Sequence, residues 1–197
     1  MKKTAIYATI ACLMLMACNG RQMKSPADER FETDSISLSG LERIEADTLD
    51  DKYATELLTS GIEAPDFALP TPKGDTLRLS DLQGEYVVLD FWASWCPDCR
   101  KDLPEVLRLY ETYHARGVTF VGISFDDDRE AWEAAVEKYA LPYFQVSELR
   151  RMRESDIAKA YGIKWIPSLY LLSPDDRVLL STVLSSRLER ALQKVVE

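Results

Sequence analysis

The sequence predicts a single α/β domain in which helices flank a mixed central sheet. From residue 86 to about residue 161, apolar runs typical of buried strands alternate with segments of helical spacing. Two strand-like segments and an amphipathic segment then complete the chain. Alternating strands and helices are typical of α/β folds, and a closing hairpin adds antiparallel strands to the sheet. The length of 197 residues corresponds to about one domain with an appendage, at roughly 150 residues per domain.

Composition and charge exclude several classes of protein. Aromatic residues make up 10% of the chain and the counts of glycine and proline are ordinary, which excludes a wholly disordered or collagen-like chain. The formal net charge is −9, whereas a nucleic-acid-binding protein needs a basic surface. Nucleic acid is therefore excluded as a partner.

The N-terminus predicts export from the cell. Lys2 and Lys3 precede an apolar run that extends to Ala17. About 14 apolar residues suit a signal peptide, whereas a membrane span needs about 20. The run ends in LMAC at residues 15–18, which resembles the lipobox of bacterial lipoproteins. The resemblance implies a signal peptide at residues 1–17 and lipidation of Cys18. The alternative is an ordinary secretory signal with Cys18 as a bystander.

Residues 18–60 are predicted to form a lipid-anchored acidic tether, which leaves residues 61–197 as the folded domain. Between Ala27 and Glu56 ten acidic residues face only three basic ones. Such self-repulsion favours an extended or loosely helical segment. A few apolar side chains would allow one short amphipathic helix within the tether: Leu41, Ile44, Tyr53, Leu57 and Leu58.

The domain is predicted to open with a hairpin and a buried strand. Residues 64–69 and 75–79 flank Lys73-Gly74, a pair suited to a hairpin turn. The apolar run from Tyr86 to Phe91 suits a strand that is buried on both faces.

The next elements follow from helical spacing and from capping residues. A helix is predicted from Pro97 to about Arg116, ended by Gly117, because glycine is common just after a helix. Three aspartates at residues 126–128 are predicted to cap a second helix. The other predicted elements are strands at 118–125 and 143–146, helices at 129–140, 155–161 and 186–196, and a hairpin of residues 168–172 and 177–181.

The sequence WCPDC at residues 95–99 carries the predicted chemistry. It follows a buried strand and opens a helix, with Pro97 in the first turn, where its missing N–H is not needed. Cys96 would thus lie at a helix N-terminus, where the free N–H groups and the dipole favour a thiolate. Cys99 lies one turn further on and could close a disulfide with Cys96. The expected cycle is attack on a target disulfide, a mixed disulfide, and resolution by the second thiol.

Two other interpretations of this pair of cysteines are weaker. A zinc site needs four ligands, and once Cys12 is removed and Cys18 is lipidated only His114 could join the two thiols. A purely structural disulfide would close too short a loop to give much stability. We therefore expect no metal and no cofactor other than the redox-active disulfide Cys96–Cys99.

Two segments resemble thioredoxin. Residues 88–99, VLDFWASWCPDC, resemble its active-site segment, and residues 161–169, YGIKWIPSL, resemble its cis-proline loop. The sequence APDF at residues 64–67, together with the extra helix and strand at about 127–147, is similar to the TlpA/ResA branch of membrane-tethered, extracytoplasmic thiol–disulfide oxidoreductases. The resemblance implies a thioredoxin-like fold with an N-terminal β-hairpin and an inserted α-β unit.

The same resemblance assigns roles to single residues. Cys96 would be the exposed nucleophile and Cys99 the resolving thiol. Asp90 matches the family's buried carboxylate, which could take the proton from Cys99; its alternative role is structural hydrogen bonding. Pro167, expected in the cis form, would face the dithiol and expose the backbone of Ile166 to a substrate segment.

Several residues beside the dithiol depart from the thioredoxin pattern. The dipeptide between the cysteines is Pro97-Asp98, and the negative charge of Asp98 should disfavour the Cys96 thiolate, which Arg100 could partly offset. These residues predict a reductant or isomerase and not a strong oxidant. Trp95 and Trp165 are assigned to substrate binding, and for Trp165 local packing is an equal alternative.

The expected function is reduction or isomerisation of disulfides in exported proteins, with cytochrome c maturation as one candidate pathway. The expected partners are those proteins, an upstream membrane dithiol donor, and the membrane itself through the lipid anchor. The protein should face the periplasm, and Asn19 slightly favours the outer membrane because it is not acidic. One alternative is a peroxiredoxin-type peroxidase. Ala93 disfavours it, because such peroxidases have Thr or Ser three residues before the nucleophilic cysteine. The other is a non-enzymatic binding lipoprotein.

Overall fold

The computed structural model describes residues 48–196. The predicted signal peptide, Cys18 and the tether up to residue 47 lie outside these described residues. Within the part of the chain that is described, no helix is long and apolar enough to cross a membrane.

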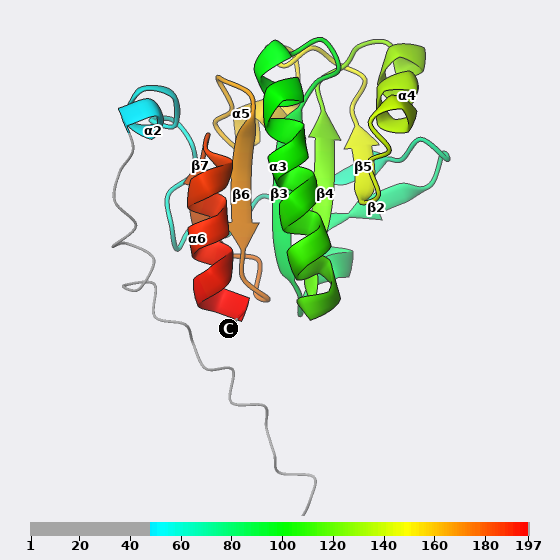
Figure 1. Cartoon of the computed structure of the whole chain (residues 1–197). Helices are drawn as coiled ribbons and strands as arrows, with labels where there is room; N and C mark the ends of the chain where they lie inside the picture. The colour runs from blue at the N-terminus through cyan, green and yellow to red at the C-terminus, as the bar shows by residue number, and fades with distance from the viewer. Residues whose placement is uncertain (1–47, 197) are drawn as a thin grey trace, which may run out of the picture. The chain divides into compact units, whose positions relative to one another are not determined.

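A five-stranded sheet of order β5-β4-β3-β6-β7 forms the centre of the domain (Figure 1). Strands β5, β4 and β3 are parallel to one another, whereas β6 pairs antiparallel with both β3 and β7. The predicted mixed sheet is thus confirmed. The strands are β3 (Tyr86–Trp92), β4 (Val118–Ser124), β5 (Phe144–Ser147), β6 (Ser168–Leu172) and β7 (Val178–Thr182).

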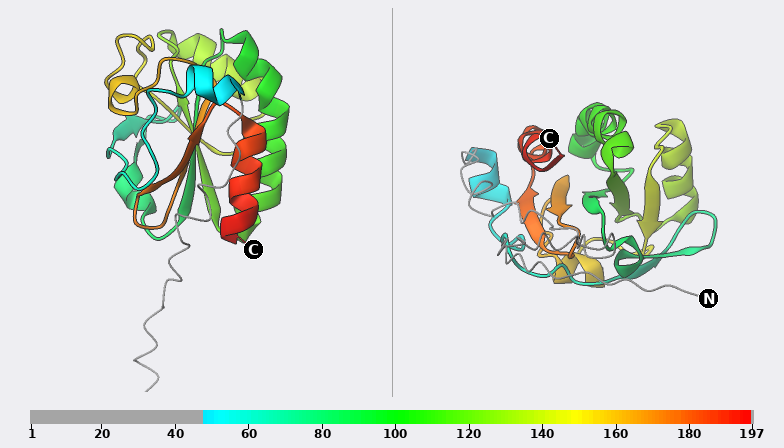
Figure 2. Two further views of the ribbon diagram at one scale, coloured as in Figure 1. Left: turned by 90° about the vertical axis from the view of Figure 1, so that its left-hand side faces the viewer. Right: turned by 90° about the horizontal axis from the view of Figure 1, so that it is seen from below.

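Helices cover both faces of this sheet. Figures 1 and 2 show α3, α4 and α6 on one face and α5 on the other. The strand-helix-strand units β3-α3-β4 and β4-α4-β5 run in one direction across the sheet, which places both of their helices on the same face. The helices are α3 (Pro97–Tyr113), α4 (Arg129–Lys138), α5 (Asp156–Ala160) and α6 (Ser185–Val196), with short 3-10 turns at η1 (Leu79–Leu82) and η2 (His114–Arg116).

The central strand β3 is buried on both of its faces. Side chains alternate between the two faces of a strand, and Val87 to Trp92 are all at most 2% exposed. Phe91 packs against the rings of Tyr161 and Tyr170. The core therefore lies on both sides of the sheet, as the unbroken apolar run of this strand predicts.

The predicted hairpin is present but shorter than expected. It consists of β1 (Ala68–Pro70) and β2 (Thr76–Arg78), which pair antiparallel beside β5. Gly74 in the turn has a φ of 89°, which glycine adopts at little cost because it has no Cβ.

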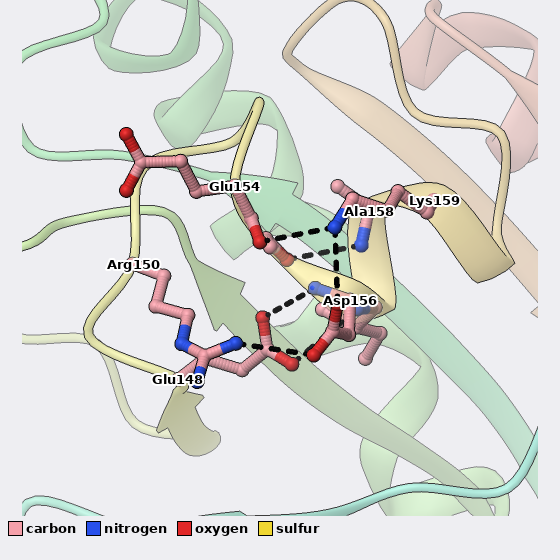
Figure 3. Close-up of polar contacts among 8 residues, drawn as sticks. Glu148, Arg150, Glu154, Asp156, Ala158 and Lys159 are labelled. Carbon is pink, nitrogen blue, oxygen red and sulfur yellow. Dashed lines mark hydrogen bonds and ion pairs between the residues drawn. The ribbon is translucent and has the colours of Figure 1, made fainter.

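The short helix α5 is held by contacts from outside itself. A five-residue helix is too short to be stable alone. Ser155 caps it by accepting a hydrogen bond from the backbone N–H of Ala158 at 3.0 Å. The Glu148 carboxylate accepts one from the N–H of Asp156 at 3.0 Å, and Arg150 pairs with the Asp156 side chain at 3.1 Å (Figure 3). These contacts fix the segment that leads into the cis-proline loop.

The folded domain begins earlier than the predicted boundary at residue 61. Residues 48–53 form helix α2 (Thr48–Tyr53), and the chain that follows packs against the sheet. Leu57 is 6% exposed, and the backbone N–H of Leu58 donates to the Tyr170 hydroxyl at 2.9 Å. A Cβ on Gly162 would lie 1.8 Å from the carbonyl oxygen of Glu56. Residues 48–60 thus belong to the domain and not to the tether.

Asp50 explains why an acid-rich segment can pack in this way. Its carboxylate is 5% exposed and accepts hydrogen bonds from the Thr182 hydroxyl at 2.7 Å and from the backbone N–H of Val183 at 2.7 Å. It also forms an ion pair with Arg187 on α6. A buried carboxylate with this set of partners has its charge compensated, so the local excess of acid does not drive α2 into solvent.

Asp50→Ala is expected to lower the free energy of unfolding by about 3 kcal/mol, because it leaves the half-buried Arg187 guanidinium and the N–H of Val183 without their acceptor. The measurement is urea unfolding of the mature chain. The control is Glu56→Ala, which removes an exposed pair with Lys164 and should cost less than about 1 kcal/mol. Equal effects of the two substitutions would contradict the packing role of Asp50.

Candidate active site

The two cysteines lie where β3 passes into α3. Cys96 is the N-cap residue of α3, with Pro97 in the first turn, and forms a disulfide with Cys99 across a Cα–Cα distance of 5.3 Å. The backbone N–H of Cys99 points at the Cys96 sulfur, with the nitrogen 3.1 Å away. A helix N-terminus offers unpaired N–H groups and a positive dipole end to a sulfur anion. The placement of this pair agrees with the sequence-based expectation.

Both cysteines are shielded from solvent in the disulfide form. The resemblance to thioredoxin implied an exposed Cys96, whereas Cys96 is 4% and Cys99 2% exposed in this structure. The reason is the cis-proline loop, whose Ile166 carbonyl oxygen lies 3.6 Å from the Cys96 sulfur. Trp95, by contrast, is 52% exposed, so the surface around the dithiol is accessible although the sulfurs are covered.

The cis-proline loop faces the dithiol as expected. The Ile166–Pro167 bond is cis. The loop leads directly into β6, whose first residue, Ser168, pairs with Phe91 of β3. The Ser168 hydroxyl donates to the carbonyl of Trp165 at 2.7 Å, which closes the loop on itself. This arrangement leaves the backbone beside Pro167 next to the Cys96 sulfur.

Asp90 is a buried carboxyl in the middle of β3. It is 2% exposed, and its Oδ2 accepts a hydrogen bond from the Tyr143 hydroxyl at 3.0 Å. Burial raises the pKa of Asp90 to about 7; the Tyr143 hydrogen bond opposes this rise, and the negative charge of Asp102 adds to it. A carboxyl with this pKa can both accept and release a proton near neutral pH.

The surroundings of Asp90 include a feature that the sequence reasoning missed. Asp90 lies beside Gly122 of β4, and Gly122 lies beside Gln145 of β5. A Cβ on Gly122 would be 2.4 Å from the side-chain oxygen of Gln145, and that oxygen accepts a hydrogen bond from the Trp92 indole at 3.1 Å. Gly122 thus leaves room for the Gln145 amide. The signal available in the sequence was a glycine inside an apolar strand, which often marks a close approach.

Two of the three aspartates after β4 have different roles. Asp128 caps α4, as predicted, by accepting from the backbone N–H of Glu130 at 2.9 Å. Asp126 instead is buried and accepts from the backbone N–H of Ser94 at 3.0 Å and from its hydroxyl at 2.6 Å. Asp126 therefore positions the loop that leads to Cys96, a role that the capping prediction did not include.

The charged residues of the first turn of α3 lie at the surface. The side chain of Asp98 is 54% exposed and pairs with Lys101 at 3.4 Å. Arg100 donates from its guanidinium to the carbonyl oxygen of Ser94 at 2.9 Å. Arg100 is thus held against the loop before Cys96, while Asp98 is paired with a different cation.

Trp165 packs locally and is also partly exposed, and its assignment to substrate binding stays a prediction. Its ring stacks on that of Tyr53 from α2, with 4.4 Å between the ring centroids and 26° between the planes. It is nevertheless 38% exposed, two residues before Pro167. Among the described residues, no group of three or more His, Cys, Asp or Glu side chains is arranged to hold a metal ion.

Comparison with protein families gives a match over most of the chain. The sequence profile of the AhpC/TSA family matches residues 60–180. The curated thiol-disulfide oxidoreductase ResA of Bacillus subtilis (strain 168) is 28% identical over 124 residues, which are 63% of this chain and 67% of that protein.

The solved structures that are similar to this chain include two disulfide oxidoreductases. A thiol-disulfide oxidoreductase from Bacteroides fragilis NCTC 9343 is similar with a TM-score of 0.65 and 36% identity, over 68% of this chain and 99% of that chain. A secreted disulfide oxidoreductase of Mycobacterium tuberculosis, homologous to E. coli DsbE, is similar with a TM-score of 0.56 and 25% identity, over 64% of this chain and 94% of that chain.

Proposed function

Because the chain belongs to the AhpC/TSA family and is a thioredoxin-like thiol–disulfide oxidoreductase, we propose that it acts as a reductant or isomerase for disulfides of exported proteins. The observation that carries this proposal is the Cys96–Cys99 pair at the start of α3, with the cis-proline loop in front of it and Asp90 buried on the strand that leads to it. The acidic Asp98 between the cysteines favours the reducing direction.

The proposed reaction follows from this geometry. The Cys96 thiolate attacks one sulfur of the substrate disulfide, the substrate's other sulfur leaves as a thiolate, and a mixed disulfide forms. Ionised Asp90 accepts the proton of the Cys99 thiol. The Cys99 thiolate then attacks Cys96, the Cys96–Cys99 disulfide closes, and the substrate leaves as a dithiol. Two electrons pass from protein to substrate, so an upstream dithiol donor must reduce the pair again.

The location is part of the proposal. The LMAC sequence at residues 15–18 supports lipidation of Cys18 and anchoring in the cell envelope, facing the periplasm. A secreted relative is consistent with an extracytoplasmic site of action. Apocytochrome c is one candidate substrate. Labelling cells with a radioactive fatty acid should mark the wild-type chain and leave Cys18→Ala unlabelled.

Insulin reduction tests the proposed function. The mature chain, supplied with a dithiol donor, should reduce insulin disulfides and cause the free B chain to precipitate. The competing peroxidase function predicts consumption of hydrogen peroxide with the same donor instead. Peroxide consumption without insulin reduction would replace the proposal with the peroxidase, and inactivity in both assays would favour a binding lipoprotein.

The redox potential of the wild-type pair is expected to lie well below about −120 mV, the value of a strong periplasmic oxidant. Asp98→Asn should raise it by about 10–20 mV, because loss of a nearby negative charge stabilises the Cys96 thiolate and hence the reduced form. Equilibration with glutathione measures both values. Asp75→Asn in the hairpin turn removes a charge at a site that does not contact the dithiol segment and should leave the potential unchanged. A fall in the potential of Asp98→Asn would refute this reasoning.

A further inference from the structure

Among the described residues, the Tyr143 hydroxyl is the group that lowers the pKa of Asp90. Burial raises this pKa to about 7 and the charge of Asp102 on α3 adds to the rise, whereas the hydrogen bond from Tyr143 opposes it. In the reduced form, the Cys99 thiol joins these groups as the proton donor of the proposed reaction. The direction and strength of the Tyr143 hydrogen bond therefore govern how readily Asp90 accepts that proton.

The Tyr143 hydroxyl has a second neighbour in Gln145, two residues further along the chain. Burial and the charge of Asp90 raise the pKa of Tyr143 well above its usual value, and the Gln145 amide opposes this rise. An amide that favours a phenolate does so by presenting its N–H to the phenolic oxygen. Gln145 thus lies on the opposite side of the Tyr143 oxygen from Asp90 in its chemical role, as a donor and not an acceptor.

Trp92 fixes which end of the Gln145 amide faces Tyr143. The Trp92 indole N–H donates to the side-chain oxygen of Gln145 at 3.1 Å. An indole N–H can only donate, so a flipped amide would set two donors against each other. The amide nitrogen of Gln145 is therefore the end left for other partners. It is buried and forms no hydrogen bond with the described residues in this disulfide form, which is costly for a donor.

Gly122 makes room for this amide beside Asp90. Gly122 of β4 pairs with Asp90 on one side and with Gln145 on the other, and residues paired in this way point to the same face of the sheet. A Cβ on Gly122 would lie 2.4 Å from the oxygen and 2.6 Å from the nitrogen of the Gln145 amide. The amide thus occupies the space that a larger residue would fill.

We propose that Gln145 is a positioning residue for the proton transfer from Cys99: when Asp90 is ionised, the Gln145 amide donates to the Tyr143 oxygen and so directs the hydroxyl proton at Asp90. The inference rests on the proposed function. A hydroxyl has one proton, and a Tyr143 oxygen that accepts from Gln145 turns that proton toward Asp90. Linked hydrogen bonds also strengthen one another. Gln145 therefore keeps Asp90 ionised at a lower pH than Tyr143 alone does.

Gln145→Met tests this role, because methionine keeps the length of the side chain and removes its donor. In the oxidised mature chain labelled with ¹³C-aspartate, NMR follows the Asp90 carboxyl carbon across pH, and Asp90→Asn identifies its signal. The pKa of Asp90 should rise by about 0.5–1 unit in Gln145→Met, the size of one net hydrogen bond. The midpoint of the resolution profile should rise equally, which slows resolution at pH 7 by about two- to fivefold.

Three further variants assign the shift to the proposed contacts. Gly122→Ala displaces the Gln145 amide without altering it and should raise the pKa of Asp90 in the same way. The double variant Gln145→Met/Tyr143→Phe should shift no more than Tyr143→Phe alone, because Gln145 acts through that hydroxyl. Ser147→Ala removes a buried hydrogen bond to the Ser124 carbonyl on the same strand and should leave the pKa unchanged.

The outcomes separate this proposal from the proposed function. An unchanged Asp90 pKa in Gln145→Met would overturn it, and so would a shift that adds fully to that of Tyr143→Phe. An equal shift in Ser147→Ala would indicate general loosening of β5 and would also overturn it. The NMR titration needs no substrate. A chain that shows the expected shifts but reduces no disulfide would therefore remove the proposed function and leave the control of Asp90 by Gln145 in place.

Discussion

Cys96→Ser is expected to reduce the rate of insulin disulfide reduction by at least about 1000-fold, because removal of a residue essential to covalent catalysis costs at least this much. Serine has no thiolate, and Cys99 lies inside the first turn of α3, whereas Cys96 is the N-cap residue whose sulfur faces the cis-proline loop. The measurement is the turbidity of precipitating insulin B chain. Retention of more than a tenth of the wild-type rate would mean that Cys99 or another group is the nucleophile.

Cys99→Ser is expected to trap the mixed disulfide between Cys96 and the substrate. Attack by Cys96 still occurs, but no neighbouring thiol remains to resolve the mixed disulfide, which therefore accumulates. Non-reducing electrophoresis followed by mass spectrometry should detect a covalent complex, which dithiothreitol should separate by reducing the mixed disulfide. The double variant Cys96→Ser/Cys99→Ser should show none. In cells, the trapped partners would identify the physiological substrates, and absence of any complex would argue against a mixed-disulfide mechanism.

Asp90→Asn is expected to slow the resolution step by about 100-fold at pH 7, the order of magnitude for loss of a positioned proton acceptor. Only ionised Asp90 can accept the Cys99 proton, so the wild-type rate of resolution should rise as the pH increases through about 7, the pKa that burial gives this group. Stopped-flow measurement of mixed-disulfide decay from pH 5 to pH 9 gives the profile. The variant should lack this rise.

The same substitution should change stability in a pH-dependent way. The Asp90 pKa is about 7 in the folded chain and 3.8 as a model group, so the folded state binds the proton more tightly. The contribution of this proton binding to the free energy of unfolding is fully present below about pH 4 and is lost as the pH rises through 7. About three pKa units correspond to at most about 4 kcal/mol. Asp90→Asn should therefore be more stable than the wild type at pH 8, measured as urea midpoints with the disulfide intact.

Tyr143→Phe provides the control for both measurements on Asp90. The Tyr143 hydroxyl donates to Asp90 and so lowers its pKa, and its loss should move the midpoint of the resolution profile to higher pH. A purely structural role for Asp90 predicts instead that neither variant changes the pH profile. An unchanged profile in Asp90→Asn would remove Asp90 from the mechanism.

The sheet and its helices could be predicted because their signals are local. The apolar run at residues 86–91 and the capping Asp128 each depend on neighbours in sequence. Gly117 likewise ends the helical segment, although the last three residues before it form the 3-10 turn η2 and α3 itself ends at Tyr113. Residues 48–60 were misassigned because what holds them is remote. In the sequence, Asp50 is indistinguishable from the solvated acids around it, because its partners Thr182 and Arg187 lie more than a hundred residues away in the chain.

In the active site, too, some features could be predicted from local sequence and others depend on the fold. The dithiol and the cis-proline lie in segments that resemble a known family, and the structure brings them together. The hydrogen bond from Tyr143 to Asp90 and the stacking of Tyr53 on Trp165 join residues of different elements. No local pattern predicts such contacts, because they depend on which strands and helices become neighbours in the fold.

The ion pair between Asp50 and Arg187 has a consequence for how the protein matures. The two residues are 137 positions apart in the chain. Synthesis runs from the N-terminus, and contacts between distant residues form late because closing the intervening loop costs entropy. The residues of the dithiol segment, β3 and α3 are therefore all made before α2 can dock. A nascent chain therefore has both of its thiols before α2 is held beside them, and only completion of the C-terminal helix supplies Arg187 and brings the Tyr53 ring onto Trp165.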